Sequence, residues 1–168
     1  VLGDQTLNYT GPPISLGSST LSIDGAGTLS NASGSPLVLD QTDSILHLIS
    51  TGIVTGPVKL ESGTLKSSGS STISGALTQS GDITIDVAET STLTYTGPPI
   101  SLGSNTLSID GAGTLSNVSG SPLVLDQTDS ILHLISTGIV TGPVKLESGI
   151  LKSSGSPTIS GALTQSGD

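Results

Sequence analysis

The 168-residue sequence contains no cysteine, methionine, tryptophan or phenylalanine, and tyrosine occurs only at Tyr9 and Tyr95. Without cysteine, the chain has no disulfide scaffold, no cysteine-ligated zinc site and no thiol nucleophile. These absences exclude several common classes of small secreted domain and of thiol enzyme before any pattern is considered.

Basic residues are also scarce. Four Lys and Arg stand against 13 Asp and Glu, which gives a net charge of -9. Because nucleic-acid affinity rests on basic side chains that neutralise phosphates, no nucleic-acid partner is expected. No apolar run approaches the ~20 residues of a membrane-spanning helix. The first residues also lack the basic start and apolar stretch of a signal peptide.

Small residues dominate what is present, with 23 Gly, 31 Ser and 22 Thr. Such a composition is compatible with disorder. The apolar residues argue against it, because 33% of the chain is hydrophobic and is mostly Leu, Ile and Val. These residues alternate with polar ones, as in residues 20–23 and 83–87. Period-two alternation predicts β-strands with one buried face.

An internal repeat organises the chain. Residues 7–82 recur as residues 93–168, and the two copies differ at five aligned positions. The differing pairs are Asn8/Thr94, Ser19/Asn105, Ala32/Val118, Thr64/Ile150 and Ser71/Pro157. Such self-similarity is typical of solenoids and arrays. We therefore expect a first repeat over 1–82 and a second over 83–168, in one continuous rod without a linker. Two small β-sandwich beads are the alternative.

Each 86-residue repeat divides into four shorter units of 23, 21, 19 and 23 residues, which begin at Pro13, Pro36, Pro57 and Ala76. Every unit contains three short strand-like segments separated by small turn residues. This order predicts an all-β fold, a parallel β-helix with about three strands per coil and four coils per repeat. Eight coils at about 4.8 Å give a rod of roughly 37 Å. Stacked Leu, Ile and Val are expected to fill the narrow interior, which suits bulky aromatic rings poorly. Gly and Asn are expected at corners that need positive φ.

Acidic residues recur at one predicted corner of the coils. The first repeat places Asp40, Asp43, Glu61 and Asp82 there, and the second places Asp126, Asp129, Glu147 and Asp168. Asp40 and Glu61 are expected to stack about 5 Å apart, where like charges repel unless water, salt or a cation screens them. A solvated corner is one interpretation, and a weak calcium site is the other, with candidates Asp40, Asp43, Glu61, Asp126, Asp129 and Glu147. No other metal site and no cofactor is predicted.

His47 and His133 are one repeat apart and lie between leucines, so their side chains are expected to point outward. Catalysis is not predicted, because no pair of carboxylates with a defined separation and no nucleophile elbow is apparent.

Asn8, Asn31 and Asn117 fit the short N-glycosylation pattern. Threonine pairs such as Thr94 and Thr96 do not recur in every coil, so a regular threonine row of the ice-binding kind is not expected.

Three segments resemble a known family: residues 25–30 (Gly-Ala-Gly-Thr-Leu-Ser), 94–100 (Thr-Tyr-Thr-Gly-Pro-Pro-Ile) and 61–65 (Glu-Ser-Gly-Thr-Leu). They are similar to the strand repeats of bacterial autotransporter passengers and related giant surface proteins. The similarity runs through the whole chain and consists mostly of Gly, Thr and Leu. The resemblance implies secretion, a rod-like right-handed β-helix and a role in adhesion or surface structure.

These observations predict a structural extracellular or cell-surface repeat protein that forms a fibre, stalk or sheath. Its expected partners are copies of itself or adjacent repeats end to end, with lateral contacts between rods as a further possibility. Val1 aligns with Val87, so the chain begins within a coil, which favours a longer tandem array or a subunit that stacks. An adhesin whose lateral face binds a glycan or a protein is the alternative. A phage fibre is a third, and it would require intertwined trimers.

Overall fold

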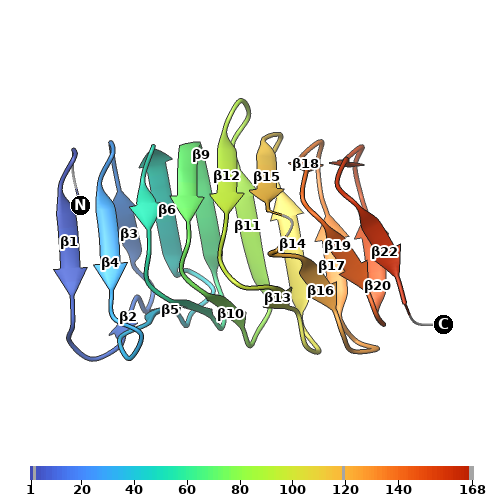
Figure 1. Cartoon of the computed structure of the whole chain (residues 1–168), viewed down its shortest axis with the longest axis horizontal. Helices are drawn as coiled ribbons and strands as arrows, with labels where there is room; N and C mark the ends of the chain where they lie inside the picture. The colour runs from blue at the N-terminus through green and yellow to red at the C-terminus, as the bar shows by residue number, and fades with distance from the viewer. Residues whose placement is uncertain (2, 119, 167–168) are drawn as a thin grey trace.

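The computed structural model describes residues 1, 3–118 and 120–166, and these residues form strands and turns without a helix. The parallel strands stack into a β-solenoid of about seven turns, one fewer than the sequence predicts. Successive coils follow one another along the long axis, with the two termini at opposite ends (Figure 1). The predicted fold class is therefore confirmed, and the described chain is one rod, not two beads.

Each coil contributes a strand to each of three faces, which we call face one, face two and face three in chain order. Face one contains β1 (Thr6–Tyr9), β4 (Thr28–Asn31), β7 (Ile53–Val54), the end of β9 (Thr64–Ile73), β12 (Thr92–Tyr95), β15 (Thr114–Asn117), β18 (Ile139–Val140) and β21 (Thr158–Ile159). Face two contains β2 (Ile14–Ser15), β5 (Leu37–Leu39), β8 (Val58–Leu60), β10 (Leu77–Gln79), β13 (Ile100–Ser101), β16 (Leu123–Leu125), β19 (Val144–Leu146) and β22 (Leu163–Gln165). Face three contains β3 (Thr20–Ile23), β6 (Ile45–Ser50), the start of β9, β11 (Ile83–Val87), β14 (Thr106–Asp110), β17 (Ile131–Leu134) and β20 (Ile150–Ser153).

The interior is a column of aliphatic side chains. Inward positions such as Leu37, Leu46 and Leu65 are fully buried, while their strand neighbours face solvent. Each buried leucine contributes about 1.5–3 kcal/mol relative to an exposed one. The aliphatic core is as the sequence predicts. One part of the expectation is wrong, because Tyr95 lies inside the column with 1% of its surface exposed.

The corners use the left-handed backbone conformation that sharp turns require. The turn from face three to face one has positive φ at Gly3, Gly25, Ser50, Thr90, Gly111 and Ser136. Glycine at these turns agrees with the sequence-based expectation. Asparagine does not take part among the described residues, and two serines and a threonine stand at the remaining turns instead.

The coil lengths explain how the two repeats join. On face two, Ile14, Leu37, Val58 and Leu77 are in register, which confirms the predicted spacings of 23, 21 and 19 residues. On face three, by contrast, the register runs Thr20, Ile45, Thr64, Thr84 and Ser108. Those spacings are 25, 19, 20 and 24 residues, a total of 88. Four coils therefore contain two residues more than one 86-residue repeat.

Face one has the same excess, since its column runs Thr28, Ile53, Thr72, Thr94 and Ser116. The register on both faces thus shifts by two residues at the repeat junction. Face two does not follow this shift continuously. Its strands form two separate sheets, with the ladder interrupted between β10 and β13. At the repeat junction, therefore, the face-two ladder is interrupted and the other two faces change register, and the candidate site lies at this level.

Candidate functional site

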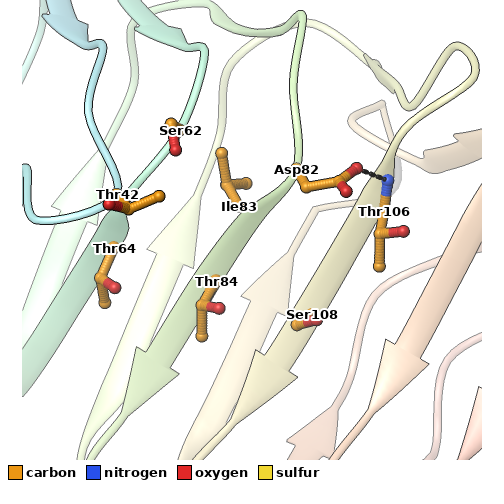
Figure 2. A pocket seen from close by; sticks show the side chains of 9 residues that line it. Thr42, Ser62, Thr64, Asp82, Ile83, Thr84, Thr106 and Ser108 are labelled. Atoms are coloured by element: carbon orange, nitrogen blue, oxygen red, sulfur yellow. Dashed lines mark hydrogen bonds between the residues drawn. The ribbon is translucent and has the colours of Figure 1, made fainter.

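A shallow groove of about 330 Å³ lies on the outside of the repeat junction, along face three. It is lined by Thr42, Ser62, Gly63, Thr64, Asp82, Ile83, Thr84, Thr106 and Ser108. Outward-facing residues of adjacent strands supply its floor, since Thr64 pairs with Thr84 and Thr84 with Ser108 (Figure 2). The lining is thus mainly hydroxyl groups, with one carboxylate at its edge.

The edge of this groove is held by the turn before β11. The Thr106 N–H donates to Oδ1 of Asp82 at 2.7 Å, as the dashed line in Figure 2 marks. The Gln79 side-chain amide donates to the Thr106 carbonyl at 2.9 Å and to the Gly81 carbonyl at 3.0 Å. Both backbone groups of Thr106 therefore bond to the turn of the preceding coil. This arrangement fixes the turn where the register shifts by two residues.

Across the same junction, Lys66 and Asp86 form an ion pair of 3.1 Å between adjacent strands of face three. Both side chains are partly exposed. Such a pair contributes at most about 1 kcal/mol and is screened by salt.

Inside the junction, Tyr95 replaces a missing part of the ladder on face two. Its hydroxyl accepts the Leu77 N–H at 3.2 Å and donates to the Pro98 carbonyl at 2.6 Å. In regular coils the corresponding N–H, that of Leu37 or Val58, donates to the backbone carbonyl of the next coil. Burial raises the pKa of Tyr95, so the phenol keeps the proton that it donates. This role of Tyr95 is not among the predictions from the sequence, although the recurrence of a lone tyrosine in each repeat was a usable signal.

The predicted acidic corner is occupied by local contacts. Asp40 accepts hydrogen bonds from the Ser15 hydroxyl and from the Gly17 N–H (2.9 Å) on the preceding coil. The Ser15 hydrogen bond is the main reason why the pKa of Asp40 lies below its usual range. In the second repeat, Asp126 accepts from the Ser101 hydroxyl at 2.5 Å and from the Gly103 N–H at 3.0 Å.

The other acidic candidates have different surroundings. Glu61 pairs with Lys59 and Glu147 pairs with Lys145, each at 2.5 Å. Asp43 and Asp129 lie at an exposed turn, Asp82 binds Thr106 as above, and Asp168 lies outside the described residues. Within the part of the chain that the structure describes, no three His, Asp or Glu side chains are grouped to hold a metal ion. The weak calcium site stays a prediction, and the oxygens of Asp40 and Asp126 are already engaged in hydrogen bonds.

His47 and His133 point outward between buried leucines, as predicted. The Nε2 atom of His47 lies 2.8 Å from the Ser68 hydroxyl, and that of His133 lies 3.0 Å from the Ser154 hydroxyl. Burial, with the neighbouring Lys66 charge, lowers the pKa of His47. A serine–histidine contact alone is not a hydrolytic site, because a third group must orient the imidazole. No carboxylate bonds to either imidazole among the described residues.

Serine and asparagine side chains bind consecutive coils together at the corners. Ser35 donates to the Gly11 carbonyl, and Ser44 donates to the Gly17 carbonyl at 2.5 Å. The Asn31 amide donates to the carbonyls of Ser35 and Pro57, both at 2.9 Å. The second repeat makes the same bonds through Asn117, Ser121 and Ser130. These residues, which composition alone treats as generic turn formers, are specific connections between coils.

The asparagine contacts also bear on the glycosylation pattern. Asn31 and Asn117 are 5% and 3% exposed, and both amides are hydrogen-bonded. Neither is accessible to a glycosyl transfer in the folded chain. Asn8 is exposed on β1.

Face one carries a column of β-branched and hydroxyl side chains. Its members are Thr6, Thr28, Ile53, Thr72, Thr94 and Ser116. Ile53 and Ser116 interrupt the threonines, so threonine does not recur in every coil of this face. Threonine suits any pleated, half-exposed sheet face, so the column by itself does not select a ligand.

No protein-family model, curated protein or solved structure matches the chain. In the described residues, no helix has the length and hydropathy to cross a bilayer.

Proposed function

We propose that this chain is a non-catalytic structural rod of the cell surface or extracellular space, in which stacked coils build a fibre, stalk or sheath. The observation that carries the proposal is the continuity of the stack. Two sheet faces run without interruption from one repeat into the next, through β9, β11 and β12. A ladder of this kind distributes load over many backbone hydrogen bonds instead of a single interface.

The corner contacts support the same role. Ser35, Ser44 and Asn31 each bind a backbone group of a neighbouring coil, and the second repeat preserves all three contacts. The same fastening therefore recurs once in each 86-residue repeat. The outward faces are formed largely by small hydroxyl side chains, which suits a spacer better than a shaped active site.

Length is the property that such a rod provides. Each added repeat of four coils extends the stack by about 19 Å at a strand spacing of about 4.8 Å. The test is immunogold electron microscopy of the source cells with an antibody raised against the purified chain. Label on extracellular filaments or at the cell surface is expected. Label confined to the cell interior would contradict the proposal.

The adhesin alternative is favoured by one observation, the hydroxyl-lined groove beside Asp82. Hydroxyl and carboxylate groups are suitable partners for the hydroxyls of a glycan. The aromatic side chains that would strengthen this alternative are not well placed, because Tyr95 is buried and Tyr9 is only partly exposed. A glycan-array screen with the wild-type chain and with Asp82→Asn and Thr84→Val variants tests it. Binding that both variants abolish supports an adhesin, and the absence of any bound glycan argues against it.

A further inference from the structure

One of the five differences between the repeats falls at a position that controls coil stacking. Ser71 of the first repeat corresponds to Pro157 of the second. Ser71 lies near the end of β9, where it pairs with Leu93 of the following coil. In the second repeat the equivalent strand is divided into β20 and β21, and Pro157 immediately precedes β21.

The direction of the backbone at this position follows from its neighbours. The N–H groups of Thr72 and Ser74 donate to Gly52 and Val54 of the preceding coil. Successive N–H groups of a strand point in opposite directions, so the Ser71 N–H is directed at the following coil, β12. In the second repeat, the N–H groups of Ser156 and Thr158 donate to Ser136 and Gly138 of the preceding coil. The nitrogen of Pro157 is therefore directed toward the opposite side, where a following coil would pair.

Proline at that position has two consequences. It has no N–H to donate, and its ring fills the space in which a neighbouring strand would lie. Within sheets, proline is confined largely to edges whose N–H side faces solvent. Natural proteins protect exposed edges from further pairing in this way.

In the first repeat this side of the coil is occupied. Leu93 of β12 pairs with Ser71, and the Thr96 N–H of the same following coil donates to the Ile73 carbonyl. A strand in that register beside Pro157 would meet a position without an N–H to donate.

We propose that Pro157 closes face one beside β21 to a strand in the β12 register, so that a second copy of this chain does not pair its strands there. The inference concerns assembly alone, and it holds whether or not the chain is a surface protein.

The test transfers the proline into the first repeat as Ser71→Pro. We expect the Thr96 amide, which bonds to the Ile73 carbonyl across the junction, to exchange its hydrogen at least about tenfold faster than in the wild type. The Thr141 amide, which bonds to Leu115 within the second repeat, serves as the internal reference. Unchanged protection of Thr96 would overturn the proposal.

Ala76→Pro is the matched control on the same coil. Ala76 occupies the position that Pro13, Pro36 and Pro57 take in the preceding coils, so proline is compatible with the stack there. We expect this variant to keep wild-type protection at Thr96. If Ser71→Pro unfolds entirely while Ala76→Pro folds, the proposal is also supported, because proline is then rejected from position 71 specifically.

The wild-type chain provides a second measurement. Sedimentation velocity and negative-stain microscopy over a range of concentrations are expected to show single short rods. A concentration-dependent series of end-to-end rods would overturn the proposal. Immunogold labelling reads location and not assembly, so the proposed function and this inference can fail separately.

Discussion

The hydroxyl of Tyr95 lies 3.2 Å from the backbone nitrogen of Leu77 and accepts its hydrogen. The two residues belong to consecutive coils at the level where the face-two ladder is interrupted. At this level a side-chain hydroxyl replaces a backbone carbonyl as the hydrogen-bond acceptor. It is also the level at which the register of four coils, 88 residues, exceeds the 86-residue sequence repeat by two. This bond allows a register shift of two residues to occur without leaving a buried N–H unpaired.

Tyr95→Phe should therefore destabilise the junction. The change leaves the Leu77 N–H and the Pro98 carbonyl without their partner, and an unpaired buried group costs about 1–3 kcal/mol. Urea unfolding followed by circular dichroism measures the loss. Tyr9→Phe is the matched control, because Tyr9 is the equivalent residue on β1 and, among the described residues, its hydroxyl makes no hydrogen bond to a backbone N–H as that of Tyr95 does. We expect that control to lie within about 0.5 kcal/mol of the wild type. Equal losses in the two variants would contradict this role for Tyr95.

Gly75→Ala tests how closely the coils approach at a corner. A Cβ atom at position 75 would lie 1.8 Å from the carbonyl oxygen of Gly56 in the coil below, so the two backbones would have to separate. We expect a loss of about 1–3 kcal/mol in the free energy of unfolding, measured by urea titration. Gly34→Ala is the control, since its Cβ would meet nothing within 4 Å. That variant should be neutral or slightly stabilised. Comparable losses in both would show that the corner spacing is not limiting.

Much of this fold could be predicted from the sequence because its information is periodic. Alternating Leu, Ile and Val specify the inward positions, and proline immediately precedes most face-two strands. The spacings of 23, 21 and 19 residues read from those prolines are the observed ones on face two. The near-identity of the repeats also predicts that the contacts of the first recur in the second, as those of Asp40 and Asp126 do.

The junction could not be predicted in this way, because it depends on how unequal coils align in space. Faces one and three shift by two residues per repeat, and this shift brings Thr64, Thr84 and Ser108 into one row of the groove. A sequence alignment at a constant offset of 86 places Thr20 and Thr106 together instead. Tyr95 is buried because it takes an inward position on β12 and strands pair with it on both sides. Composition alone gave the wrong expectation for this aromatic interior residue.

Ser136→Ala tests the electrostatics of the corner between face three and face one. The Ser136 hydroxyl donates to Oδ1 of Asp110 at 2.6 Å, and this bond, with the Gly111 N–H, lowers the pKa of Asp110. A carboxylate with a lowered folded pKa stabilises the fold above its unfolded pKa of about 3.9 and loses that contribution as pH falls through the folded value. In the variant, the pKa of Asp110 should rise toward its ordinary value.

Carbon-13 detected titration of the Asp110 carboxyl measures this change. Acid unfolding of the variant should also begin at a higher pH than that of the wild type. Ser50→Ala is the control, because Ser50 has the same sequence context and a similar φ of 59° but lies in the first repeat. It should leave the titration of Asp110 unchanged. A pKa of Asp110 that is the same in wild type and Ser136→Ala would contradict the assignment.

Thr90→Gly should stabilise the chain, although it removes a side chain. Thr90 is exposed and has φ of 64°, a conformation that costs a β-branched residue about 1–2 kcal/mol. Glycine relieves this strain, and Gly25 and Gly111 already adopt positive φ in the same corner of other coils. The greater freedom of glycine in the unfolded chain offsets part of the gain, which leaves about 0.5–1 kcal/mol. Glu89→Gly is the control, because Glu89 is the preceding exposed turn residue and has no positive φ. This variant should lower the free energy of unfolding by about 0.5–1 kcal/mol, since glycine again has greater freedom in the unfolded chain and no strain is relieved. Urea unfolding of both variants decides the matter, and destabilisation by Thr90→Gly would show that the threonine side chain contributes more than the strain costs.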